Sequence, residues 1–215
     1  RENPNLHILP VDLGRIDHLE TFWFDIEPIT FRQQDVVLEG PRYVLKFLHV
    51  LYDASKTGKL DLSSADYNLQ SLHIPEDRFT NLTELNLARN YFSEIPEYLL
   101  RFTDLRELSM EENKVDSIPL SIAKLQNLRV LNLRGNNIAV LPQDIGTLTD
   151  LRRLLLDKNE LTQLPAEIGQ MINLQDLFVS ENYLASIPSA IGDLTGLQDL
   201  RVHYNNLQSL TRELI

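Results

Sequence analysis

The fold is decided by residues 128–150, LRVLNLRGNNIAVLPQDIGTLTD, and by the 23 residues that follow them, LRRLLLDKNELTQLPAEIGQMIN. The two stretches carry leucine, asparagine and proline at the same places, in the pattern L-x-x-L-x-L-x-x-N-x-L-x-x-L-P-x-x-I-x-x-L-x-x. Six copies of it follow one another at a step of 23, and they start at Leu82, Leu105, Leu128, Leu151, Leu174 and Leu197. Such self-similarity predicts a stack of small, similar structural units.

The apolar spacing changes within each copy. Leu131 and Leu133 alternate with polar residues, which is the period of a β-strand with one buried face. Later apolar residues, such as Leu164 and Ile168, are three and four apart, which predicts a loop that turns into a short helical or 3₁₀ segment. Stacked copies therefore form a parallel sheet backed by a helical layer. Strands are about 4.8 Å apart and helical segments are wider, so the stack should curve with its strands on the inside.

Two further residue types recur where the chain turns. Asparagine occupies the ninth place of every copy, and its amide can satisfy backbone groups of its own turn and the next one. Proline occupies the fifteenth place of five copies, and Thr211 stands there in the sixth. Proline fixes φ at a turn that needs no N–H donor. Both columns are therefore interpreted as structural rather than catalytic.

Residues 82–214 resemble the typical intracellular leucine-rich repeat with its L-P-x-x-I signature, and the 23-residue Ras-group class in particular. Similar repeats occur in bacterial effector and secreted proteins. The resemblance implies an α/β leucine-rich-repeat solenoid, a curved horseshoe arc with a parallel concave sheet. It also implies intracellular signalling partners such as small GTPases or phosphatases. The motif is specific for fold and only weakly specific for function.

The chain before the regular repeats predicts a different organisation. Leu60 and Leu62 begin an irregular repeat, because matching Leu60 to Leu85 gives a step of 25. Residues 43–54 carry apolar side chains at helical spacing after Gly40-Pro41, which predicts a capping helix, with a separate partner-binding helix as the alternative. We expect at least one more helix within residues 1–39. The predicted organisation is a mostly helical cap over 1–56, an irregular repeat over 57–81 and six repeats over 82–215, the last incomplete.

Composition narrows the classes of partner. The 215 residues carry a net charge of −11 and no cysteine. An acidic surface repels phosphate backbones and anionic headgroups, so we expect neither nucleic acid nor a membrane as partner. The lack of cysteine excludes disulfides and favours a reducing compartment, so we expect a cytoplasmic protein, with a secreted bacterial effector as the alternative. We also expect a monomer.

No motif for catalysis or a cofactor is visible. Gly58-Lys59 lacks the earlier glycine and the following hydroxyl residue of a P-loop. The five histidines are scattered without metal-ligand spacing. Glu111-Glu112 is better explained as a solvated pair than as an acid–base pair. We therefore expect a protein that is not an enzyme and binds no metal or cofactor.

Binding residues should come from places three, five, seven and eight of the repeat, which face outward on the concave sheet. Leu155 and Phe178 are large apolar residues predicted to face solvent on adjacent strands. Arginine and aromatic residues surround them, which is the composition of a protein-binding hot spot. The predicted partner-binding residues are Arg134, Arg153, Leu155, Asp157, Phe178, Arg201, His203 and Tyr204. A second group, Glu84, Glu107, Glu111 and Glu112, could steer a basic partner or be a solvated face.

Three functions are compatible with these observations. The first is a protein–protein interaction module that binds its partner on the concave strand face. The second is the substrate-recognition domain of a larger enzyme, and the third is a bacterial effector or surface protein whose other parts are absent here.

Overall fold

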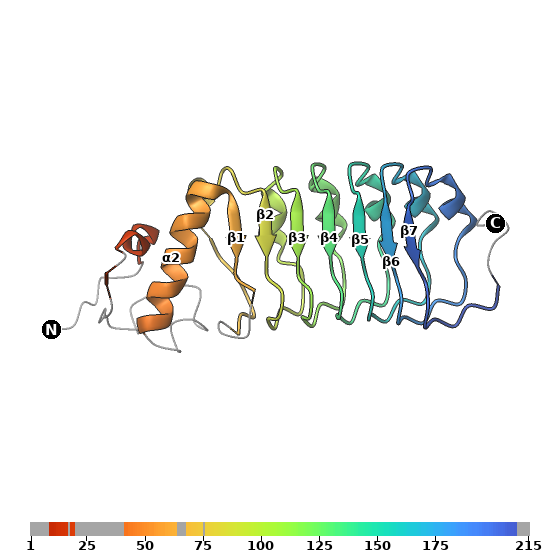
Figure 1. Ribbon diagram of the computed structural model, residues 1–215, viewed down its shortest axis with the longest axis horizontal. Helices are drawn as coiled ribbons and strands as arrows, with labels where there is room; N and C mark the ends of the chain where they lie inside the picture. Colours follow the sequence, from red (N-terminus) through yellow and green to blue (C-terminus); the bar gives the residue numbers. More distant parts are fainter. Residues whose placement is uncertain (1–8, 17, 20–40, 64–67, 75, 210–215) are drawn as a thin grey trace.

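The computed structural model describes residues 9–16, 18–19, 41–63, 68–74 and 76–209 of the chain. In this part, one parallel sheet runs along the whole length of the molecule, with strands in sequence order (Figure 1). Its strands are β1 (Lys59–Asp61), β2 (Glu84–Asn86), β3 (Glu107–Ser109), β4 (Val130–Asn132), β5 (Arg153–Leu155), β6 (Asp176–Phe178) and β7 (Asp199–Arg201). The predicted solenoid is confirmed.

The register of the sheet follows the repeat. Each strand places its middle leucine beside the middle leucine of the next, as in the pairing of Leu108 with Leu131 and of Leu131 with Leu154. Those leucines are buried from β1 to β6. β1 pairs Leu60 with Leu85, so the irregular copy joins the sheet at the step of 25. This step is two residues longer than the regular one, and residues 64–67 of the irregular copy lie outside the described part.

The layer behind the sheet consists of 3₁₀ helices, the narrower of the two forms that the spacing allowed. They are η2 (Glu76–Arg78), η3 (Glu97–Arg101), η4 (Leu120–Lys124), η5 (Gln143–Thr147), η6 (Ala166–Gln170) and η7 (Ser189–Asp193). The repeat proline directly precedes each helix from η3 to η7, with φ between −61° and −69°. This is the φ to which its ring restricts it. The last residues of the sixth repeat lie outside the described part.

The asparagines form the expected ladder of buried amides. Asn136 donates from Nδ2 to the carbonyl oxygens of Leu133 (3.0 Å) and Met110 (2.9 Å). Its Oδ1 accepts the backbone N–H of Val115 at 2.9 Å. The same bonds recur at the other ninth places. Each amide therefore bridges its own turn to the preceding one. The prediction of a bridge to the next turn was wrong, because the bonds reach the preceding turn.

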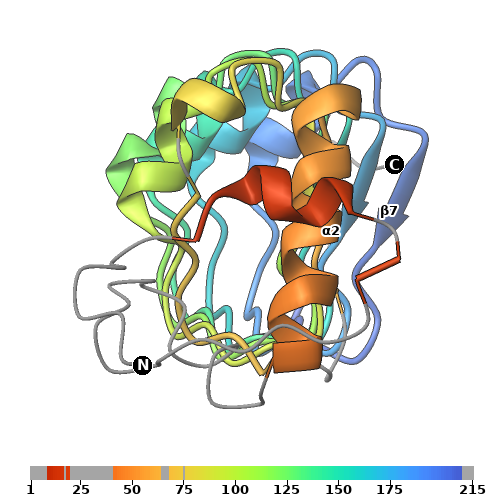
Figure 2. The same ribbon diagram turned by 90° about the vertical axis from the view of Figure 1, so that its left-hand side faces the viewer.

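The β1 end of the sheet is covered by the helix α2 (Pro41–Thr57), as Figures 1 and 2 show. Val44, Phe47, Leu48 and Leu51 are buried in the core, so the predicted stripe packs against the first strand. The 3₁₀ helix η1 (Val11–Arg15) crosses the outer side of α2 (Figure 2) and forms the described helical part of residues 1–39. The additional helix expected there otherwise falls on residues outside the described part.

A tight turn joins this cap to the sheet. Gly58 follows α2 with φ of +71°, and its carbonyl oxygen accepts the N–H groups of Thr83 (2.8 Å) and Glu84 (3.1 Å). A Cβ atom at Gly58 would lie 2.3 Å from the carbonyl oxygen of Asn81. Only glycine satisfies both the left-handed backbone and this close approach. The cap is therefore fixed in register with β2.

The eighth place of every regular repeat has the same left-handed backbone. Positive φ values between 52° and 64° occur at Arg89, Glu112, Gly135, Lys158, Glu181 and Tyr204. A non-glycine residue in this region is uncommon, because its Cβ is crowded. The five non-glycine side chains at this place are all exposed, at the edge where the chain leaves the sheet.

Candidate functional site

The candidate site is the concave face of the sheet, where side chains at the third and fifth places alternate with buried leucines. Most of the described third-place residues are charged: Lys59, Glu84, Glu107, Arg153, Asp176 and Asp199, with Val130 between them. A groove of about 420 Å³ lies over β1 to β5. A second hollow of about 290 Å³ lies at the strand exits of the later repeats and is lined by Arg134, Asp157, Arg201 and His203, among others.

Leu155 and Phe178 do not face solvent, contrary to the sequence-based prediction. Both lie on the concave side, yet each is only 4% exposed. The guanidinium of Arg201 lies 3.8 Å from the centre of the Phe178 ring, and that of Arg134 lies 5.4 Å from it. Cation–π attraction stabilises this arrangement. The two apolar residues are therefore the buried floor of the site rather than an exposed hot spot, and two guanidinium groups lie over the Phe178 ring.

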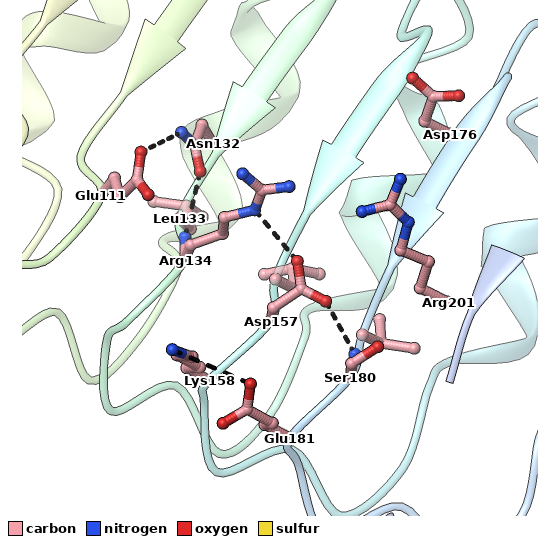
Figure 3. A network of polar contacts seen from close by, with 12 residues as sticks. Glu111, Asn132, Leu133, Arg134, Asp157, Lys158, Asp176, Ser180, Glu181 and Arg201 are labelled. Atoms are coloured by element: carbon pink, nitrogen blue, oxygen red, sulfur yellow. Dashed lines mark hydrogen bonds and ion pairs between the residues drawn. The ribbon is translucent and has the colours of Figure 1, made fainter. Parts of the chain in front are cut away.

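Ion pairs between neighbouring strands hold the arginines in place (Figure 3). Arg134 Nε lies 3.0 Å from Asp157 Oδ2, and Arg153 Nε lies 2.8 Å from Asp176 Oδ2. Asp157 also accepts the backbone N–H of Ser180 at 3.0 Å (Figure 3). Asp157 is therefore a central acceptor for two strands.

Arg201 is arranged differently, because it pairs within its own strand. Its Nη2 lies 2.8 Å from Asp199 Oδ2, and this hydrogen bond raises the pKa of Arg201, further raised by the charges of Asp199, Asp157 and Asp176. About half of its side chain remains exposed. Arg201 is thus a fixed positive charge on the outer side of the Phe178 ring.

Aromatic residues are exposed beside this arginine. His203 accepts or donates a hydrogen bond with Ser180 Oγ at 2.9 Å, and its ring meets that of Tyr204 edge-on at 5.2 Å. Tyr204 is 78% exposed. Tyr183, 58% exposed on the neighbouring repeat, was missed by the sequence reasoning. It occupies the tenth place, after the ladder asparagine, and the prediction considered only places three to eight.

The structure therefore brings the predicted residues together unequally. Arg134, Asp157, Phe178 and Arg201 form one connected cluster. His203 adjoins it in the second hollow and Tyr204 packs against His203, whereas Arg153 lines the groove over β1 to β5.

The groove over β1 to β5 has a different charge at its β1 end. Lys59 Nζ lies 2.7 Å from Glu84 Oε1. This hydrogen bond raises the pKa of Lys59, and the charges of Glu84 and Glu107 act in the same direction. Glu111 accepts a hydrogen bond from Asn132 Nδ2 at 2.9 Å (Figure 3). This end of the groove is thus rich in carboxylates.

Within the described residues, no group of three or more histidine, cysteine or acidic side chains is arranged to hold a metal ion. No helix in that same part is long and apolar enough to cross a bilayer. Away from the concave face, burial raises the pKa of the Tyr98 hydroxyl, and the Tyr98 ring stacks on His73 at 5.1 Å.

Comparisons with known proteins agree on the fold. The family model described as a leucine-rich repeat region matches residues 62–215. A search of curated proteins finds no match. Among solved structures, the chain is similar to a leucine-rich-repeat protein of Leptospira interrogans, with 34% identity and a TM-score of 0.70 over 75% of this chain and 42% of that one.

Two further solved structures are similar over the same share of the chain. An internalin of Listeria monocytogenes has 26% identity and a TM-score of 0.62, covering 74% of this chain and 48% of the internalin. The plant peptide hormone receptor RGFR1, solved in complex with RGF2, has 34% identity and a TM-score of 0.59, covering 74% of this chain and 26% of the receptor. The chain thus matches less than half the length of each of these three proteins.

Proposed function

This chain belongs to the leucine-rich repeat family, and from that premise we propose that it is a protein-interaction module whose concave strand face holds a partner protein. One observation carries the proposal. The positions that build the scaffold hold the same residue types from copy to copy, whereas the outward positions of the strands differ in charge, size and polarity. Variation that the scaffold does not need, on a continuous face, is the arrangement expected for recognition of one particular partner.

The proposed contact residues are those predicted from the sequence, but two pairs of them have a different role from the one predicted. Arg153, Arg201, His203 and Tyr204 supply exposed contacts, and arginine and tyrosine are enriched at binding hot spots. Arg134 and Asp157 hold the arginine cluster in place. Leu155 and Phe178 form its floor and reach a partner only where the arginines above them move.

The relatives support the same class of function without naming a partner. One of the similar structures is a receptor in complex with RGF2. Because this chain matches only part of each relative, the activities of the whole proteins are not transferred to it. We propose a binding role without catalysis by these 215 residues.

A site-specific cross-linking experiment tests the proposal. A photoreactive amino acid replaces His203 on the concave side or, as a matched control, Gln170 at the end of η6 on the opposite layer; both positions are exposed. Each variant is irradiated in extract of the cells that produce the protein. We expect a protein adduct from position 203 at least about five times as abundant as from position 170. Equal yields, or a higher yield from position 170, would contradict the concave face as the binding site.

A second pair of variants tests the contact residues. Arg201→Glu combined with Tyr204→Ala should weaken capture of the cross-linked partner about tenfold or more, whereas Gln170→Ala should leave it unchanged. Interface truncations at hot spots are worth about 1–4 kcal/mol, which corresponds to this range.

A further inference from the structure

Charged side chains on the concave face follow a directional pairing rule. A cation on one repeat pairs with an acid at the same place of the next repeat. The pairs are Lys59–Glu84 (2.7 Å), Arg89–Glu112 (3.1 Å), Arg134–Asp157 (3.0 Å), Arg153–Asp176 (2.8 Å) and Lys158–Glu181 (3.9 Å). Asp199 on β7 pairs with Arg201 instead. Of the four described third-place carboxylates, Glu84 and Asp176 follow the rule, Asp199 has a cation from its own strand, and one is left without a cation.

Glu107 is that exception. Among the described residues its side chain makes no hydrogen bond or ion pair, and it is exposed. Its register neighbours are Glu84 on β2 and Val130 on β4. Arg153 is two strands away, about 10 Å at the usual strand spacing, which is too far for an ion pair. Like charges directly opposite one another on a sheet are destabilising, so Glu107 beside Glu84 is unfavourable in the free protein.

The surroundings of Glu107 offset its charge only in part, through the attraction of Lys59. On β1 to β3 and the turns after them, the outward places hold five carboxylates and two cations, which leaves a formal charge of −3. The two cations, Lys59 and Arg89, are bound to Glu84 and Glu112. Glu111 receives only a neutral amide donor, from Asn132. The uncompensated charge of the concave face is therefore negative and is concentrated at β3.

The unpaired carboxylate of Glu107 lies in a groove that also contains an apolar residue. Glu84, Glu107 and Val130 line the groove of about 420 Å³. Val130 is half-buried and stands in a column that is otherwise charged on the described strands. An apolar surface thus lies one strand from an unpaired carboxylate, within a groove that crosses five strands.

We propose that this groove binds an extended segment of the partner protein that places a lysine or arginine against Glu107 and an apolar side chain on Val130. The inference rests on the proposed function and adds the chemistry of the partner. A cation from the partner would fill the gap in the pairing rule and relieve the repulsion between Glu84 and Glu107. Charge complementarity of this kind raises the association rate and depends on ionic strength.

The test uses the whole chain and two fluorescent peptides with blocked ends. The basic peptide alternates lysine and serine over eight residues with a valine in place of one central lysine, so that the valine and the remaining lysines lie on the same face of the extended chain. The acidic peptide has glutamate in place of lysine. Affinity is measured by fluorescence anisotropy at low and high salt. The variants are Glu107→Gln and, as the control, Glu94→Gln, which makes the same charge change at an exposed position outside the groove lining.

We expect the basic peptide to bind and the acidic peptide not to bind. Glu107→Gln should weaken the basic peptide at least about fivefold, and Glu94→Gln less than twofold. The melting temperature of Glu107→Gln should equal or exceed that of the unaltered chain, which separates lost binding from lost folding. Absence of binding by the basic peptide, or equal weakening by the two variants, would overturn the inference.

The outcome is separable from that of the proposed function. If the basic peptide fails but position 203 still yields the protein adduct, the groove inference is wrong and the interaction module stands. If the peptide binds as expected but position 203 yields no more adduct than position 170, the groove binds cationic peptides, and the proposal that the concave face holds a partner protein in these cells is contradicted.

Discussion

Replacing Asn136 by alanine should lower the free energy of unfolding by about 2–4 kcal/mol, since each buried backbone group left without a partner costs about 1–3 kcal/mol. Asn136 sits in the middle of the ladder. Its loss leaves the N–H of Val115 and the carbonyl oxygen of Met110 without the bonds of 2.9 Å that they now make to it. The methyl group of alanine can neither accept a hydrogen bond from Val115 nor donate one to Met110, so these groups become unsatisfied in the interior.

Asn205 is the matched control, because it makes the same bonds at the partly exposed β7 end of the stack. Water can reach the groups that Asn205→Ala releases, so its cost should be about 1 kcal/mol or less, near the net value of one hydrogen bond. The two variants therefore separate the effect of the amide from the effect of its burial.

Two measurements check this prediction. Urea denaturation gives the change in unfolding free energy, provided that the transition stays cooperative along the repeats. Hydrogen exchange reports the specific bond, because the amide proton of Val115 should lose most of its protection in Asn136→Ala while that of Leu131 keeps it. A loss below about 1 kcal/mol together with an unchanged Val115 amide would refute the assignment of the ladder as a buried structural element.

Three other perturbations probe different parts of the molecule. Leu131→Ala, which truncates a fully buried side chain, should cost about 2–5 kcal/mol in denaturant melts, and a loss below about 1 kcal/mol would contradict the repeat register. Gly58→Ala should cost about 1–3 kcal/mol because its Cβ meets the Asn81 carbonyl at a positive φ; the same melts check it, and an unchanged midpoint would mean that the cap is not held by this turn. Arg201→Ala should change stability by about 1 kcal/mol or less but uncover Phe178, which a rise in fluorescence of a hydrophobic dye would report; no rise would show that other side chains cover the ring.

The regular part of the fold could be predicted because it repeats. A step of 23 fixes which leucines lie side by side, and the fixed φ of proline marks where each 3₁₀ helix begins. The left-handed backbone at the eighth place gives no such signal, since the residues there share no chemical property. Only Gly135 hints at it.

The candidate site could be predicted less well, for a physical reason. The alternation of apolar and polar residues along a strand predicts the face to which a side chain points, but not which other side chains cover it. Arginine has a long stem, so Arg201 reaches the Phe178 ring from the neighbouring strand and Arg134 reaches it from two repeats away, and together they help to bury it. Covering of this kind depends on rotamers and ion pairs of other repeats, which the pattern of one repeat does not contain.

The gapless step of 23 between Leu82 and Leu197 also makes the chain divisible into interchangeable modules. Excising residues 128–150 as one unit would leave the leucine, asparagine and proline columns in phase, so the shortened protein should still fold. The order of charges on the concave face would change where the two flanking repeats meet. Glu107 would then stand directly beside Arg153 and gain a counter-ion that now lies two strands away, while Glu111 would stand beside Asp157 at the new junction. Changing the number of modules would thus alter which molecules the concave face selects, without altering a single side chain in the modules that remain.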